Sequence, residues 1–165
     1  ARILTIYEGT TAIQANDLMG RKTARDGGQS ARAIAEQIAK TEADLQASGT
    51  AAALSMARHL QTAREAFLQT VDFVAGKAKA SPNAVYAGSV PYLMLTGNLV
   101  AGWQMGRALL VAQDKLAAGE EAAFMQAKII TAQFYAEHIL TRVPGLAHTV
   151  CTGGESACAL PLEAF

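Results

Sequence analysis

The sequence contains few charged side chains and two cysteines. Its 14 basic and 14 acidic residues balance, and charged residues make up 17% of the chain. Without a basic excess the chain lacks the electrostatic signature of a nucleic-acid partner, so we expect none. Cys151 and Cys158 are too few for the disulfide framework of a small secreted domain. A reducing compartment, the cytoplasm, is therefore the expected location.

One long stretch has no charge at all, and it must be tested as a membrane span. No charged residue lies between Lys79 and Arg107, and the run is long enough to cross a bilayer. Pro91 and several polar residues interrupt it, and no basic cluster of the kind that orients membrane helices flanks it. A helix that is apolar all round also suits the centre of a helical bundle. We expect a bundle helix and no membrane span.

The apolar residues recur at spacings of three and four, and no alternating strand pattern is present, which predicts an all-α fold. Turn and cap residues divide the chain into helices at about 11–26, 30–47, 50–79, 81–118 and 120–143, the fourth with a kink or irregular start at Pro91. The last four predict an antiparallel up-and-down four-helix bundle over 28–145. An active-site loop and one helix precede it in 1–27, and 146–165 is expected to be a tail. Ile34 and Leu54 are expected on inward-facing stripes, and Phe124 and Phe134 are expected in core or inter-domain packing.

The stretch IYEGTTAIQANDLMGRK, residues 6–22, places an acid directly before a helix start. Thr11 and Gln14 have the spacing of a capping box. Helix N-termini bind anions through free backbone N–H groups, and a carboxylate in a dry site walled by Tyr7 would have its pKa raised toward the range of a general base. The simpler interpretation of Glu8 is a surface acid beside a helix start, with Gln14 completing the capping box. The residues alone leave both interpretations open.

The same stretch resembles the C-terminal active-site segment of the flavin-dependent acyl-CoA dehydrogenases. The later chain, with its ending CALPLEAF, resembles the extra C-terminal helical domain of a large bacterial branch of that family. The matching positions are Tyr7, Glu8, Gly9, Thr10, Ile13 and Gln14, followed by Arg21.

The resemblance implies specific roles. Glu8 would remove the α-proton of a fatty acyl-CoA thioester while a hydride leaves the β-carbon for FAD, giving a trans-2-enoyl-CoA. Tyr7 and Gly9 would lie against the acyl-CoA substrate. Electron-transfer flavoprotein would accept the electrons, and the complete enzyme would be a homodimer. On this interpretation the chain is a fragment, inactive without the remaining domains of its parent. Thr10, Thr11, Ala12 and Gln14 would contact the flavin nucleotide.

The alternative is a non-catalytic helical interaction or dimerisation module. Under either interpretation an exposed apolar patch is expected around residues 6–22, where the usual partners would be missing. Arg21, Lys22 and Arg25 could meet a phosphate, although a solvated basic turn is the simpler interpretation. The histidines and cysteines lack the spacing of a metal site, and Ser156, His138 and Asp114 lack the sequence context of a hydrolase triad.

Overall fold

The computed structural model describes residues 9–164, and its regular elements are all helical. This confirms the predicted all-α class. In chain order the elements are α2 (Thr11–Met19), the π-helical turn η1 (Gly20–Ala24), α3 (Gln29–Ser48), α4 (Ala51–Lys77), α5 (Pro82–Tyr86), α6 (Ser89–Ala117), α7 (Ala122–His138), the 3-10 turn η2 (Leu140–Arg142), α8 (Val143–Thr152), α9 (Gly154–Ala157) and the 3-10 turn η3 (Leu162–Ala164).

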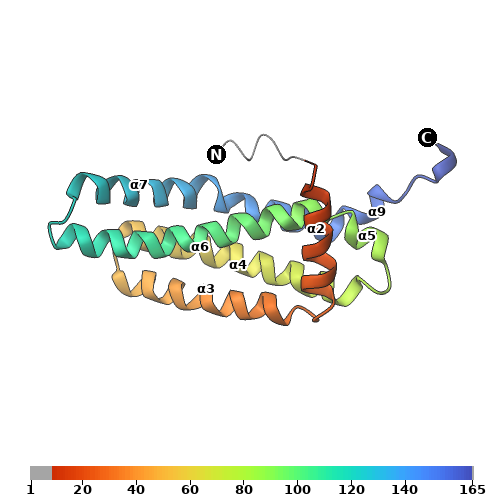
Figure 1. Ribbon diagram of the computed structural model, residues 1–165, viewed down its shortest axis with the longest axis horizontal. Coiled ribbons are helices and arrows are strands. Elements are labelled where there is room, and N and C mark those ends of the chain that lie inside the picture. Colours follow the sequence, from red (N-terminus) through yellow and green to blue (C-terminus); the bar gives the residue numbers. More distant parts are fainter. Residues whose placement is uncertain (1–8, 165) are drawn as a thin grey trace.

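Helices α3, α4, α6 and α7 run side by side along the long axis of the molecule, and α2 crosses them at one end (Figure 1). The turn between α3 and α4 shows how the sequence fixes this arrangement. Gly49 ends α3 with a φ of 68°, a conformation that glycine adopts without a Cβ clash. The next residue, Thr50, begins α4 by accepting a hydrogen bond from the Ala53 N–H at 3.2 Å. The antiparallel bundle is as predicted.

The bundle core is built from small and branched side chains with polar pairs at its edge. Arg64 donates from Nε and Nη2 to the two carboxylate oxygens of buried Glu42, at 2.8 and 2.9 Å. The Trp103 indole donates to Thr41 at 2.8 Å and ties α6 to α3. The largest fully buried side chains are Tyr92, Met19, Ile38, Leu45, Met56, Leu60, Leu95, Leu99, Leu109, Leu140, Val71 and Val74.

The fourth predicted helix is divided, and the break lies before Pro91. The chain forms α5, turns at Ala87 and Gly88, and resumes as α6. Gly88 sits against Val150, where a Cβ would come within 3.0 Å of that side chain. Pro91 lies in the first turn of α6, where its missing N–H costs no intrahelical bond. Of the two alternatives expected at Pro91, a kink or an irregular helix start, the structure shows a new helix start two residues before it. Within residues 9–164 no helix is long and apolar enough to cross a membrane.

The fifth predicted helix was expected to end before Pro144 and Gly145, but the chain turns through η2 and continues as α8. Pro144 again falls in a first helical turn, the position in a helix that tolerates proline best. Ala147 and Val150 of α8 are buried in the core. Part of the expected tail thus completes the bundle.

Two further expectations are wrong. The N-cap of α2 is Thr10, one residue earlier than predicted, and its side chain makes no cap hydrogen bond. Met125, Ile129, Ala132 and Ala136 occupy the inward side of α7, and this leaves the two phenylalanines of that helix outside. Ile34 and Leu54 were expected inside the bundle but are exposed. Phe124 and Phe134, for which core or inter-domain packing was expected, are exposed as well.

Candidate functional site

The described part of the motif, from Gly9 on, lies at an open helix end. Gly9 and Thr10 are exposed and lead directly into α2. The φ of Gly9 is 119°, and no atom lies within 4 Å of the position that a Cβ would take. Ala12 and Gln14 also face solvent, while Thr11 is half-buried. This end of α2 is therefore accessible to a partner from outside the bundle.

Tyr7 and Glu8 lie outside the described residues, so the base and one of the two substrate contacts expected from the motif stay predictions. The structure brings Gly9, Thr10, Thr11 and Ala12 together in one turn of chain. Gln14 follows in the same helix, where its N–H bonds to the Thr10 carbonyl at 2.9 Å. These are the residues with which an exposed helix N-terminus could receive the anionic or carbonyl groups of a nucleotide.

The other end of α2 is fixed rigidly to the bundle through η1. Ala15 and Met19 are buried. The hydroxyl of Thr23 donates to the Leu18 carbonyl at 2.9 Å and lies 2.9 Å from the hydroxyl of buried Tyr92 on α6. Turns of π-helix are uncommon and occur often at functional sites. The described part of the motif therefore leads into a short helix whose far end is held by buried contacts.

Acidic and basic side chains surround this junction. Asp17 pairs with Arg21 at 3.0 Å and with Lys22 at 3.5 Å. Asp26 accepts hydrogen bonds from the N–H groups of Gly28 and Ser30 at 2.8 and 3.0 Å. Hydrogen bonding from Ser30, first from its side chain and then from its backbone, lowers the pKa of Asp26 below its ordinary value. Arg21 and Lys22 thus form a basic turn partly neutralised by Asp17.

A cavity of about 410 Å³ lies beneath this turn, bounded by η1, α3, α4 and α6. Phe67 and Tyr92 stand at its base with their rings parallel and their centroids 6.3 Å apart. Arg21 and Lys22 stand among its lining residues. Burial raises the pKa of Tyr92 above its ordinary value, so the phenol stays protonated and can donate to Thr23. Sequence reasoning missed this cavity, because its walls combine residues 18–34 with Phe67 of α4 and with Tyr92 and Thr96 of α6, which lie far from them in the chain.

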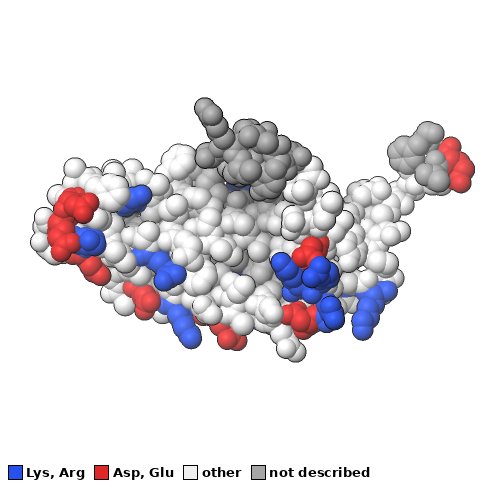
Figure 2. All heavy atoms as spheres, in the orientation of Figure 1, with Lys and Arg blue, Asp and Glu red and all other residues white. Residues whose placement is uncertain are grey.

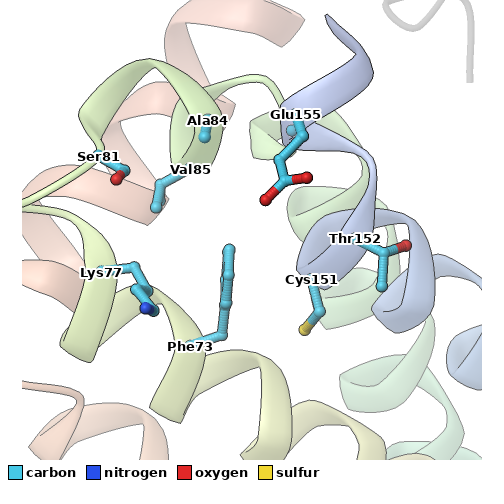
Figure 3. A pocket seen from close by; sticks show the side chains of 9 residues that line it. Phe73, Lys77, Ser81, Ala84, Val85, Cys151, Thr152 and Glu155 are labelled. Carbon is cyan, nitrogen blue, oxygen red and sulfur yellow. The ribbon is translucent and has the colours of Figure 1, made fainter. Parts of the chain in front are cut away.

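A second cavity, of about 380 Å³, lies at the same end of the bundle between α4, α5 and the α8–α9 segment. Figure 3 shows Phe73 pointing into it, with Lys77 on one side and Cys151 on the other. Burial raises the pKa of the Cys151 thiol, which keeps it in the unreactive protonated form.

Residues 32–161 match a protein family described as acetyl-CoA dehydrogenase C-terminal like. The chain belongs to that family. The acetyl-CoA dehydrogenase C-terminal-like match covers the bundle from α3 to beyond α9, and the resemblance noted for residues 6–22 adds the segment before it.

Individual relatives agree with the family. Over 156 residues the chain is 52% identical to 3-methylmercaptopropionyl-CoA dehydrogenase of Ruegeria pomeroyi, covering 94% of this chain and 26% of that protein. It is 35% identical to the broad-specificity linear acyl-CoA dehydrogenase FadE5 of Mycobacterium tuberculosis, over 85% of this chain and 24% of the relative. The chain is 30% identical to butyryl-CoA dehydrogenase of Syntrophomonas wolfei, over 99% of this chain and 27% of that protein. The chain thus spans about a quarter of the length of these relatives, and its origin is in the acyl-CoA dehydrogenases.

Proposed function

We propose that this chain acts as the C-terminal part of a longer acyl-CoA dehydrogenase that oxidises the α,β bond of an acyl-CoA thioester. The observation that carries the proposal is the open start of α2. The motif resembling the family's active-site segment ends on a helix N-terminus whose first residues are exposed and whose other end is anchored in the bundle. A substrate and cofactor held by other domains can reach such a helix end.

Within this proposal Glu8 is the base that removes the α-proton of the thioester, and Tyr7 and Gly9 lie against the substrate. The space where a Cβ of Gly9 would stand is empty, so the backbone can approach a ligand closely. FAD, when bound, supplies the hydride acceptor. The open helix start fits a nucleotide, and Thr10, Thr11, Ala12 and Gln14 are the residues that would hold it.

The remaining requirements of the reaction are also proposals. Most of the flavin and thioester pocket would come from other domains, so the chain by itself is expected to be inactive. Electron-transfer flavoprotein is the proposed electron acceptor, the complete enzyme is proposed to be a homodimer, and the cytoplasm is the proposed compartment. The names of the three relatives refer to different acyl-CoA thioesters, although each of these proteins contains a segment similar to this chain. The acyl specificity therefore depends on the rest of the enzyme.

The test is flavin bleaching in the full-length enzyme, with wild type beside Glu8→Gln. 3-Methylmercaptopropionyl-CoA, butyryl-CoA and longer linear thioesters are added in turn without an electron acceptor. Glutamine keeps the size and hydrogen-bonding capacity of glutamate but cannot take the proton. We expect wild type to bleach with at least one thioester and Glu8→Gln to bind that thioester without bleaching.

Arg21→Gln serves as the matched control, because it removes a neighbouring exposed charge on the same segment and is expected to bleach like wild type. Equal bleaching by wild type and Glu8→Gln would remove Glu8 as the base. Absence of bleaching in the wild type with every thioester would favour the alternative, a helical interaction module. That alternative has its own observation, because large apolar side chains such as Met94 of α6 and Phe134 of α7 are exposed.

A further inference from the structure

The cavity between α4, α5 and the α8–α9 segment combines apolar walls with charges of both signs. Phe73 and Val85 are among its apolar walls, and Lys77 and Glu155 are its charged side chains. Its volume of about 380 Å³ lies within the range of pockets that hold small molecules, roughly 300–1,000 Å³. This make-up suits a small molecule with an apolar body and charged groups.

Close packing of the backbone fixes the walls of this cavity. Gly154 of α9 is buried, and a Cβ at this position would overlap the carbonyl of Ala84 on α5. Gly88, directly after α5, lies equally close to Val150 of α8. A side chain at position 154 would therefore push α9 away from α5. Because α5 and α9 are held together in this way, the cavity is part of the fold itself.

The two charged side chains of the cavity do not neutralise each other. Lys77 lies in the last turn of α4, and Glu155 lies in the first turn of α9. Within residues 9–164 neither side chain forms an ion pair or a hydrogen bond. In Figure 3 they stand on opposite sides of the Phe73 ring, which points into the cavity between them.

Other opposite charges of the bundle pair directly with each other. Arg32 contacts Asp72 at 2.6 Å, and Lys115 contacts Glu120 at 3.1 Å. On the face drawn in Figure 2, acidic and basic side chains likewise lie in mixed groups. The charges of the cavity differ, because they line one hollow without closing it. A molecule that carries both charges can therefore pair with each of them.

We propose that this cavity binds a small zwitterion with an apolar body, of the kind that a free apolar amino acid represents. The carboxylate of the ligand pairs with Lys77, its ammonium group pairs with Glu155, and its apolar part packs against Phe73. Ser81 offers a further hydrogen bond, because its side chain makes no cap bond in α5. A ligand with charge of one sign would be repelled by one of the two side chains.

The two cysteines of the chain provide the test. Cys151 lines the cavity and is half-buried, whereas Cys158 is exposed and lies outside the lining. The full-length enzyme is alkylated slowly with iodoacetamide at neutral pH, and fragment-ion mass spectrometry reads the rate at each cysteine. We expect leucine or phenylalanine to slow alkylation of Cys151 several-fold and to leave Cys158 unchanged.

Two analogues of leucine separate the charges of the ligand. 4-Methylpentanoate lacks the ammonium group and 3-methylbutylamine lacks the carboxylate, so both should protect Cys151 less than leucine does. Equal protection by either analogue would overturn the zwitterion assignment. If neither amino acid protects Cys151, or if Cys151 does not react even without ligand, the cavity is not an open binding site and the proposal is wrong.

Variants of the two charged side chains assign the pairing. Lys77→Met should abolish the advantage of leucine over 3-methylbutylamine, and Glu155→Gln should abolish its advantage over 4-methylpentanoate. Lys79→Met is the matched control, because it removes an exposed cation at the same end of the bundle that does not line the cavity. We expect it to respond to leucine like wild type. Equal losses in Lys77→Met and Lys79→Met would contradict direct pairing.

This site goes beyond the proposed reaction, because it involves neither Glu8 nor the flavin. An enzyme that bleaches with a thioester but whose Cys151 no amino acid protects retains the proposed function and loses this site. An enzyme that leucine protects but that bleaches with no thioester retains the site and loses the proposed function.

Discussion

The hydroxyl of Tyr92 on α6 lies 2.9 Å from the hydroxyl of Thr23 in η1, and both residues are buried. Because Thr23 donates its proton to the Leu18 carbonyl, Tyr92 is the donor in the bond between them. This pair joins η1, and through it α2, to α6 in the centre of the bundle. Removing the donor and removing the acceptor should therefore cost different amounts of stability, and this difference gives a first prediction.

Tyr92→Phe removes the donor but leaves Thr23 bonded to Leu18, so we expect a loss of about 1 kcal/mol in unfolding free energy. Thr23→Val leaves the Tyr92 hydroxyl buried without its partner, and the expected loss is about 2–3 kcal/mol. Urea unfolding of the two single variants and the double variant measures both losses and their coupling. A larger loss for Tyr92→Phe than for Thr23→Val would contradict the donor assignment.

A second prediction concerns the ion pair of Arg64 and Glu42. The hydrogen bond to Glu42 is the main cause that raises the pKa of Arg64, so the pair stays charged at neutral pH. Arg64→Met would leave the buried Glu42 carboxylate without its cation, at an expected cost of about 2–3 kcal/mol.

Two comparisons isolate that effect. Replacing both partners with methionine should recover most of the loss, because no unpaired charge remains buried. Lys115→Met removes one partner of an exposed pair with Glu120 and should cost less than about 1 kcal/mol. Guanidinium chloride is a salt and screens exposed ion pairs, whereas urea does not. The loss of unfolding free energy in Arg64→Met should be the same in both denaturants. No recovery in the double variant would contradict the explanation.

Two glycines of α6 predict opposite effects for the same substitution. A Cβ on Gly102 would overlap the side chain of Leu140, which sits directly over it. Gly102→Ala should therefore destabilise the chain by about 1–3 kcal/mol through overpacking. Gly97 has no atom within 4 Å of its Cβ position, so Gly97→Ala should stabilise the isolated chain by about 0.5–1 kcal/mol through helix propensity. Thermal unfolding of both variants is the measurement, and equal signs would refute the close packing of α6 on Leu140.

A fourth prediction concerns acid stability. The folded-state pKa of Asp26 is lowered from its ordinary value of 3.8, so the unfolded chain binds the proton more readily. Its stabilising contribution is present above pH 3.8 and is lost as the pH falls through the folded-state pKa. In Asp26→Asn the melting temperature should therefore fall less steeply than in wild type as the pH falls through that range. Asp44→Asn removes a charge that makes no hydrogen bond within the described residues and is the control. The prediction would be contradicted if the melting temperatures of Asp26→Asn and wild type fell equally steeply with falling pH.

The sequence by itself determined the helical class and most of the bundle. The spacing of apolar residues placed α3 and α4 nearly to the residue, and Gly49 followed by Thr50 marked the turn between them. These signals are local, because a helix end depends on the backbone freedom of one residue and the hydroxyl of the next. The motif from Tyr7 to Gln14 likewise indicated the family, to which the comparison of the whole chain assigns it.

Only the tertiary structure decided where the predicted helices break and which apolar residues face outward. The break before Pro91 depends on Val150 packing against Gly88, a contact between residues far apart in the chain. Phe134 lies on an apolar stripe of its helix, but it is exposed, and Ala136 takes the inward side. The reason is geometric: a helix can present several apolar stripes, and the placement of its neighbours selects the one that is buried.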